Sequence, residues 1–569
     1  MTAIDDFFTH YYARRPVNAT FTGVHAYDDQ LPDWSFDGVE ALDDEMKTLG
    51  SALASEFPAP ASAAAFRNNR DLLDAELARA FLEVQRAENA TGHGPRGNPA
   101  LWTGEAIFSV VSLMIRDFAP VGERVEAAVM RLRRIPAFLG HSERRPERPE
   151  ARNDDPVLMP WIEKTLRECE GASILLSTGM ERWLASAPAS AQTVARARAC
   201  AESARDAFQT LATRLASQPD PQPPTVACGP DLYDLLLTRG HFCTRSRADL
   251  LIEAKDRFET ARADLAALAC SAAGSWPNAQ EQIAADHPTR DEYHSVFETT
   301  WQACHECAER ANVISWPDNW PIRYGSYPPW TADAAPHLYY LHYRSPAPFD
   351  AVDVYEYVVP GMPEDPVEAD KLLRVWNHST IKLNHVVHHG AIGHHVQNWY
   401  AYNQQRSRIG KVAGVDCANR IGMFLGGTMT EGWACYATDV MEELGFLTPL
   451  ERVSQQHTRV RMLARAIVDI ELHQGTMAFG EAIRLYEEQV GISTAAASAE
   501  AVKNSMFPCT AIMYWLGTQG IHDLRGEMQR REAPRFSLRR FHGELLGYGS
   551  IPVSLVSRMM TERPVPLPG

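Results

Sequence analysis

The chain has 569 residues, of which 22% are charged and 45% are hydrophobic, which is typical of a globular rather than a disordered protein. Its length corresponds to roughly three or four domain-sized units, although a helical enzyme of this size can form one continuous body. The formal net charge of −17 argues against nucleic acid or an anionic membrane as a partner.

The N-terminus and the cysteines indicate the compartment. The first residues include early acids and no long apolar run, unlike a signal peptide, and no stretch is long enough to span a membrane. The ten cysteines are scattered, so reduced thiols are expected. The one CxxC, Cys304-His305-Glu306-Cys307, has no second ligand pair nearby and is expected to hold ordinary helix cysteines. We therefore predict a cytoplasmic protein with no membrane partner.

Apolar residues recur at helical spacing through most of the N-terminal half. Residues 7–35 are predicted to form a helix that Pro16 ends, followed by a loop. Helical periodicity continues over 37–90, and the polar stretch 89–98 interrupts it. The proline-rich stretch 217–224 is predicted to be a surface loop between helices. Further helices are predicted at about 104–115, 121–139, 156–185, 189–216 and 247–273.

The character of the chain changes at Trp316. Aromatic residues and prolines crowd 316–330, and the segments 338–343 and 352–359 have the composition of strands. Helical periodicity returns at about Pro366 and continues to the C-terminus. The sequence therefore predicts a mainly α protein with a small β insert around residues 338–360. We expect one continuous body with an N-terminal helical region (1–315), an aromatic and proline-rich segment with the small sheet (316–365), and a C-terminal helical region (366–569).

A histidine cluster is the most informative feature of the sequence. Five of the 20 histidines fall between His385 and His395, and Glu431 follows on a predicted helix further along the chain. Imidazoles and a helical glutamate are ligands that zinc prefers, and a catalytic zinc needs three of them plus an open position. The cluster therefore predicts a metal site. A run of core or surface histidines on one helix is the alternative.

Spacing alone leaves the ligand pair open. The usual helical solution, His-Glu-x-x-His, places two imidazoles on one face and is absent here. His388 and His394 are six positions apart, so an unbroken helix would place them about 120° apart. Gly390 and Gly393 would permit a kink that returns both to one face.

An unbroken helix offers two other pairs. It would align His388 with His395, and His385 with His389. In each case Glu431 is a candidate third ligand, which would complete a set of two histidines and one carboxylate.

Two motifs give the sequence a resemblance to a known family. The stretch His388-His389-Gly390-Ala391-Ile392-Gly393-His394-His395-Val396-Gln397 is similar to the pattern His-Glu-x-x-Pro-Gly-His-His-x-Gln, and Glu431-Gly432-Trp433-Ala434-Cys435-Tyr436-Ala437 is similar to Glu-Gly-Trp-Ala-x-Tyr-Ala. These patterns belong to a bacterial family catalogued as domain of unknown function 885, which looks like a distant branch of the zincin metallopeptidases. The resemblance spans nearly the whole chain and is weakest between about 316 and 366.

The resemblance implies a fold and a ligand set. The fold would be a large helical, zincin-like (gluzincin-type) scaffold. His388, His394 and Glu431 would bind a divalent metal, with zinc as the first choice and iron as the alternative. The family's general base, a glutamate, is replaced here by His389, which could act as the base instead or become a metal ligand.

Further residues are candidates for supporting roles. Tyr514 could stabilise an oxyanion, with a buried core tyrosine as the alternative. His395, His473 and His542 could orient ligands or substrate, although a hydrogen-bonded core histidine is the simpler interpretation of the last two. Arg540 could bind a substrate carboxylate or form a structural salt bridge.

The pattern predicts a divergent metal-dependent hydrolase with His389 and Tyr514 as catalytic residues. Its partner would be a small molecule or a short peptide with an amide-like or other metabolite structure. Two alternatives remain open: a repurposed iron enzyme of the oxygenase type, and a catalytically inactive pseudopeptidase that serves as a binding module.

Overall fold

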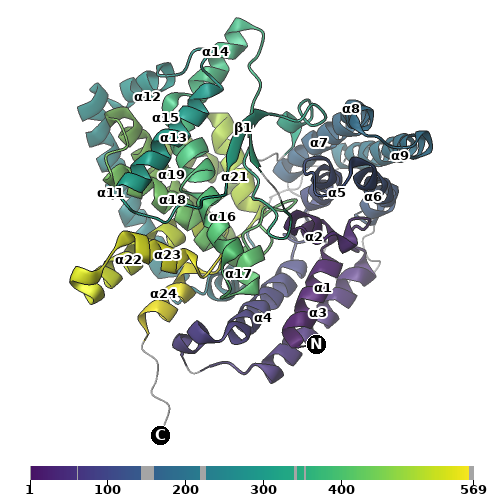
Figure 1. The fold of residues 1–569 in the computed structure, drawn as a ribbon, viewed down its shortest axis with the longest axis horizontal. Coiled ribbons are helices and arrows are strands. Elements are labelled where there is room, and N and C mark those ends of the chain that lie inside the picture. Colours follow the sequence, from purple (N-terminus) through teal and green to yellow (C-terminus); the bar gives the residue numbers. More distant parts are fainter. Residues whose placement is uncertain are drawn as a thin grey trace.

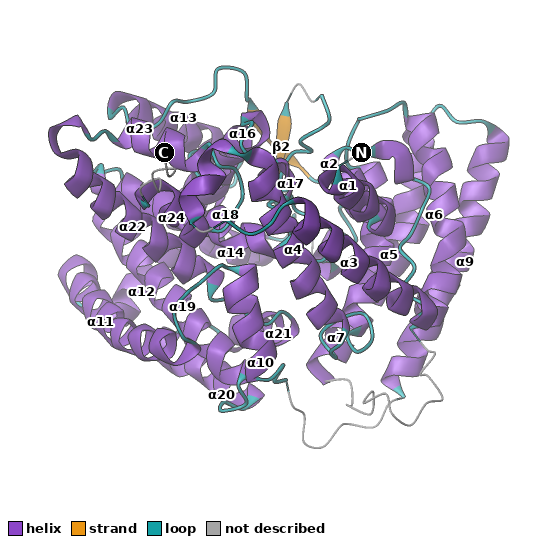
Figure 2. Cartoon of the chain, turned by 90° about the horizontal axis from the view of Figure 1, so that it is seen from below, coloured by secondary structure: helices purple, strands orange, loops and turns teal. Residues whose placement is uncertain are grey.

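The computed structural model describes residues 2–60, 62–142, 159–217, 226–338, 342–351 and 354–562. Over these ranges the chain is mainly helical, with a single two-stranded sheet, as Figures 1 and 2 show. The prediction of a mainly α protein with a small β element is confirmed. In the same ranges, no helix combines the length and apolar character needed to cross a bilayer.

The helices of the N-terminal half follow the predicted periodicity, with one correction. Pro16 ends the first helix but also begins the second, because its fixed φ suits the first position of a helix. The polar interruption ends at Asn98, whose side chain caps the next helix. The predicted loop at 217–224 lies, after Ser217, outside the described residues. The bounds are α1 (Ala3–Arg14), α2 (Pro16–Thr22), α3 (Phe36–Glu56), α4 (Arg70–Asn89), α5 (Pro99–Met114), α6 (Val121–His141), α7 (Met159–Ile174), α8 (Met180–Ser186), α9 (Ala191–Ala216), α10 (Pro230–Leu235), α11 (Arg247–Ala273), α12 (Trp276–Ala285) and α13 (Ser295–Arg310).

The sheet differs in part from the prediction. Strand β2 (Tyr355–Val359) lies inside the predicted insert, but its parallel partner β1 (Ile322–Ser326) comes from the proline-rich segment before it. In the predicted strand 338–343, Tyr343 makes only an isolated bridge to β2, and residues 339–341 lie outside the described residues. The tyrosine of each strand, Tyr324 and Tyr357, is buried, with ring centroids 5.0 Å apart.

The C-terminal half carries the remaining helices. Their bounds are α14 (Pro366–Val375), α15 (His378–Thr380), α16 (His394–Asn403), α17 (Arg408–Val412), α18 (Gly427–Glu443), α19 (Pro449–His473), α20 (Phe479–Arg484), α21 (Thr494–Met506), α22 (Met513–Glu532), α23 (Leu538–Leu546) and α24 (Val553–Thr561). The π-helical segments are η3 (Leu175–Gly179), η4 (Leu236–Gly240), η6 (Ile381–Gly390) and η8 (Leu485–Val490). The short 3₁₀ turns are η1 (His25–Tyr27), η2 (Ala63–Asn68), η5 (Ala335–His337), η7 (Phe424–Gly426) and η9 (Ala533–Arg535).

Packing places α18 and α19 at the centre of the molecule. In Figures 1 and 2, α6 and α9 lie side by side at one end and α11 and α12 at the other. Helix α18 packs against α22, and α19 packs against α11. One buried apolar cluster joins distant parts of the chain, from Phe7 in α1 to Met559 in α24. The first and last helices therefore share a core with α18.

Candidate metal centre

A break between η6 and α16 shapes the histidine cluster. The helical backbone stops at Gly390 and restarts at His394, so the kink that the glycines permit is present. The backbone N–H of Gly393 donates to the carbonyl oxygen of Val387 at 2.9 Å. A β-carbon on Gly393 would lie only 1.9 Å from the carbonyl oxygen of His388. Only glycine therefore fits this position without a backbone shift.

Two tryptophans satisfy the carbonyl groups that the break leaves without helical partners. Trp301 of α13 donates its indole N–H to the oxygen of Gly390 at 2.9 Å, and Trp433 of α18 donates to Ile392 at 2.9 Å. A buried carbonyl left unpaired would cost about 1–3 kcal/mol. These two hydrogen bonds therefore stabilise the bend and tie α18 to it.

Close helix packing sets the position of Glu431. Helix α18 meets α22 at Gly432 and Gly517, where a β-carbon on Gly432 would lie 2.4 Å from the α-carbon of Gly517. The glycine after Glu431 thus allows the two backbones to touch. Glu431 precedes this contact on α18 and interacts with the histidines of the neighbouring bend.

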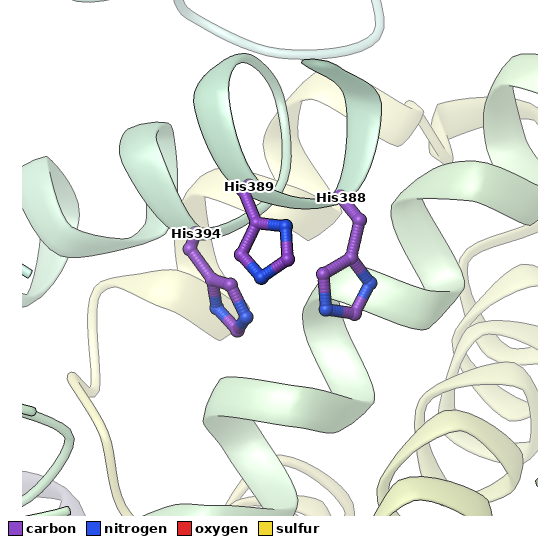
Figure 3. Close-up of side chains that lie close together, drawn as sticks. All are labelled: His388, His389 and His394. Carbon is purple, nitrogen blue, oxygen red and sulfur yellow. The ribbon is translucent and has the colours of Figure 1, made fainter. Parts of the chain in front are cut away.

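The donor atoms of the cluster are spaced as a metal requires. The Oε2 atom of Glu431 lies 3.5 Å from Nε2 of His388 and 3.6 Å from Nε2 of His394. A tetrahedral zinc ion with bonds of about 2.0–2.1 Å holds its ligand atoms about 3.3 Å apart. His389 joins them, since ligand atoms of His388, His389 and His394 all lie within 4.8 Å of one another. In Figure 3 the three imidazole rings turn toward the same space.

His389 is held in one orientation by the backbone. Its Nδ1 lies 2.6 Å from the carbonyl oxygen of Asn384, so this nitrogen carries the proton and donates. The lone pair of Nε2 is then free to face the other histidines. Histidines that bind metals commonly show this arrangement, and a histidine that accepts a proton needs the same lone pair.

Electrostatics favours the protonation states that metal ligands need. Burial lowers the pKa of His388, and burial with the neighbouring imidazoles lowers the pKa of His389 well below its ordinary value. Although burial opposes ionisation of Glu431, the imidazoles of His388 and His394 hold its pKa well below the ordinary range. Neutral imidazoles and an ionised carboxylate are the forms that coordinate a divalent cation. The donor set and its spacing therefore fit a metal ion.

The cluster opens into a cavity of about 980 Å³. Tyr514 of α22 lines this cavity. The guanidinium of Arg465 lies over the Tyr514 ring, 4.8 Å from its centroid, and forms a bidentate ion pair with Glu500 of α21. The volume falls within the range of small-molecule sites.

In the alternative ligand pairs, the ring nitrogens of His395 and His385 bond other groups. His395 is buried outside the cavity, with Nε2 2.9 Å from the carbonyl oxygen of Trp320 and Nδ1 3.3 Å from the hydroxyl of Tyr343. His385 stacks on Trp376, with ring centroids 3.9 Å apart. Both histidines reach the site indirectly: His395 through Tyr343 in the cavity wall, and His385 through His389, with ring centroids 6.5 Å apart.

The other predicted supporting residues lie away from the cavity. His473 and His542 are buried and bonded to backbone carbonyl oxygens, and Arg540 is in a surface ion pair. All three residues therefore make the interactions expected of structural residues: hydrogen-bonded core histidines and a salt bridge. The partners are the carbonyl of Asn504 for His473 at 2.8 Å, the carbonyl of Val313 for His542 at 2.7 Å and the carboxylate of Glu532 for Arg540.

The cavity wall also holds charged residues that the sequence analysis did not assign to the site. Helix α19 contributes Arg459, Arg461 and Arg465, and α21 contributes Glu500 and Lys503. The sequence does hold one signal, because Arg461 and Arg465 are four positions apart on a predicted helix. Like charges at this spacing repel each other unless a partner compensates.

Comparisons with known proteins agree with this fold. The model of the family described as "Bacterial protein of unknown function (DUF885)" matches residues 16–560, and the chain belongs to this family. A protein from Shewanella oneidensis, described as a candidate lipoprotein of unknown function, shares 18% identity over 98% of this chain and 99% of its own, with a TM-score of 0.75. A candidate lipoprotein from Colwellia psychrerythraea shares 16% identity over 98% of each chain, with a TM-score of 0.71. These likenesses show the fold alone, and no curated protein matches the sequence.

Proposed function

We propose that this protein is a metal-dependent hydrolase that acts on a small amide or peptide-like substrate. The observation that carries the proposal is the distance of Oε2 of Glu431 from Nε2 of His388 (3.5 Å) and from Nε2 of His394 (3.6 Å), close to the separation of ligand atoms in a tetrahedral zinc site. These three residues would hold the metal, on a scaffold of the zincin type. Zinc suits two imidazoles and a carboxylate, and iron accepts the same set.

The metal, when bound, would supply a Lewis acid that activates water and polarises the substrate carbonyl. His389 takes the position of the general base. Its Nδ1–H is tied to Asn384, so its Nε2 can accept a proton from water and return it to the leaving nitrogen. Tyr514, held under Arg465, is the candidate to stabilise negative charge on the carbonyl oxygen.

Metal content and turnover test this proposal together. The purified protein is expected to hold one divalent ion per chain and to release primary amine from a panel of N-acyl amino acids and dipeptides. Removing the metal with a chelator should abolish this release, and adding it back should restore it. The proposal fails if no metal binds on reconstitution, or if turnover survives complete metal removal.

A variant separates the roles open to His389. His389→Ala should retain the metal and lower kcat by roughly 10²–10⁴-fold if the residue is the base. Loss of the metal would make His389 a ligand instead, and unchanged turnover would remove it from the mechanism. His141→Ala, at the end of α6 and outside the cavity, is the matched control.

A further inference from the structure

The cavity of the candidate metal centre is rich in cations, and many of them are neutralised by the protein. Arg465 pairs with Glu500 through two hydrogen bonds, and Arg459 pairs with Asp439 at 2.6 Å. Two further cavity cations have partners of the same kind. Arg420 pairs with Glu88 at 2.6 Å, and Lys164 pairs with Glu168.

Arg461 differs from these residues. It lines the same cavity from α19, but with the described residues it forms no hydrogen bond and no ion pair. Its Nε is shut off from solvent and has no acceptor. Arg465 follows one turn later on the same helix, so the two positive charges repel each other. A guanidinium kept in this setting is costly to the fold, which points to a ligand that compensates it.

The surroundings of Arg461 indicate where such an anion would bind in the cavity. The groups that act on its charge are Arg465, Glu500, Tyr514 and Cys435. Cys435 lies on α18 four residues after Glu431, and one helical turn rises about 5.4 Å. An anion bound by Arg461 would therefore share the cavity with Glu431 and the clustered histidines.

We propose that Arg461 binds the carboxylate of the substrate, which makes the substrate class short N-acyl amino acids or peptides whose free carboxylate lies next to the amide that is cleaved. This inference rests on the proposed hydrolase function. The planar guanidinium fork matches a carboxylate. A phosphate dianion would call for more positive charge, whereas Arg459 and Arg465 are already bound to carboxylates.

The reaction on such a substrate is a simple hydrolysis. Water adds its oxygen to the acyl carbon, the carbon–nitrogen bond breaks, and one proton of the water passes to the leaving nitrogen. The products are a carboxylic acid and an amino acid. The carboxylate held by Arg461 takes no part in the bond changes, so Arg461 orients the substrate.

Binding to the full-length protein tests the inference without turnover. Titration calorimetry on chelator-treated protein would compare N-acetyl-L-leucine with N-acetyl-L-leucinamide, which lacks the charge. The carboxylate is expected to bind about 10- to 100-fold tighter, since a hydrogen-bonded charge contributes this much. Arg461→Gln should abolish that preference. Arg452→Gln, an exposed position on the same helix, should keep it.

A lysine variant and a phosphate probe distinguish the charge of Arg461 from its planar shape and a carboxylate from a phosphate. Arg461→Lys retains the charge without the fork and should lose most of the preference. It also replaces Arg461→Gln if thermal unfolding shows that the glutamine variant is not folded. A preference that is absent in the wild type, or that persists in the folded variants, overturns the inference. Tighter, Arg461-dependent binding of methyl phosphate overturns the carboxylate assignment.

The outcomes also separate this inference from the proposed function. If carboxylate binding depends on Arg461 but no amide is hydrolysed, the hydrolase proposal fails and the anion site stands. If hydrolysis occurs with equal kcat/KM on carboxylate and carboxamide substrates, the hydrolase stands and the role of Arg461 is refuted.

Discussion

Replacing Glu431 with glutamine removes one negative charge from the candidate metal centre and keeps the size of the side chain. The carboxylate oxygen lies 3.5 Å from Nε2 of His388 and 3.6 Å from Nε2 of His394, so within the described part of the chain it is the anionic donor that contacts both. Changes to groups that merely orient metal ligands already cost 10- to 100-fold in affinity. Loss of a direct anionic ligand should therefore weaken metal binding by at least about 100-fold, or about 2.8 kcal/mol.

Competition with a chromophoric chelator would measure the affinity of wild type and variant for Zn²⁺. Glu443→Gln is the matched control, because Glu443 lies on the same helix but its side chain is 44% exposed and paired with Arg525. The reasoning is refuted if Glu431→Gln still binds one metal ion with an affinity within about threefold of wild type. The ligands would then be the three clustered histidines, His388, His389 and His394.

Two further predictions concern the bend and the pH dependence of stability. Gly393→Ala should destabilise the fold by about 3 kcal/mol or more and abolish metal binding, because the new methyl group would meet the carbonyl oxygen of His388 at 1.9 Å; chemical unfolding and metal titration measure both effects. Although burial lowers the pKa of His25, the carboxylates of Asp28 and Asp350 raise it to about 9 in the folded protein. A pKa that is higher in the folded than in the unfolded protein stabilises the fold. This stabilisation is complete at pH values below the unfolded pKa near 6.5, and it is lost as the pH rises through 9. The free energy of unfolding should therefore be larger at pH 6 than at pH 9.5. This difference should be about 1–2 kcal/mol greater in the wild type than in His25→Gln, after discounting for the partial exposure of His25.

Each of these predictions has a control. Gly361→Ala introduces the same methyl group where no atom lies within 4 Å, and it should leave stability and metal binding nearly unchanged. An equal loss in both glycine variants would show that the bend at Gly393 is not the cause. For His25, identical pH profiles in wild type and variant would rule out the link to the two carboxylates.

Periodicity predicted the helices well because one face of each helix must be buried. It failed at the sheet, where β1 is a five-residue strand between prolines and carries little alternation. Its identity as a strand depends on pairing with Tyr355–Val359, which a local pattern cannot reveal. The same limit applied at Pro16, since a proline that ends one helix is also suited to begin another.

The candidate site was predictable to the extent that it depends on local geometry. The two glycines indicated a kink, and the kink brings His388 and His394 to the same carboxylate. The sequence did not show Arg461 as a cavity residue, although its spacing from Arg465 was visible. What distinguishes Arg461 is that its Nε is buried without an acceptor among the described residues, and that property exists only in three dimensions.

The contacts that hold the bend do not involve the side chain at position 389. The break is held by the glycine at 393 and by the indole groups of Trp301 and Trp433, and none of these contacts uses the side chain at 389. The ring of His389 is fixed separately, by the backbone carbonyl of Asn384. A substitution at 389 is therefore expected to change a group that lines the cavity and to leave His388, His394 and Glu431 in their positions.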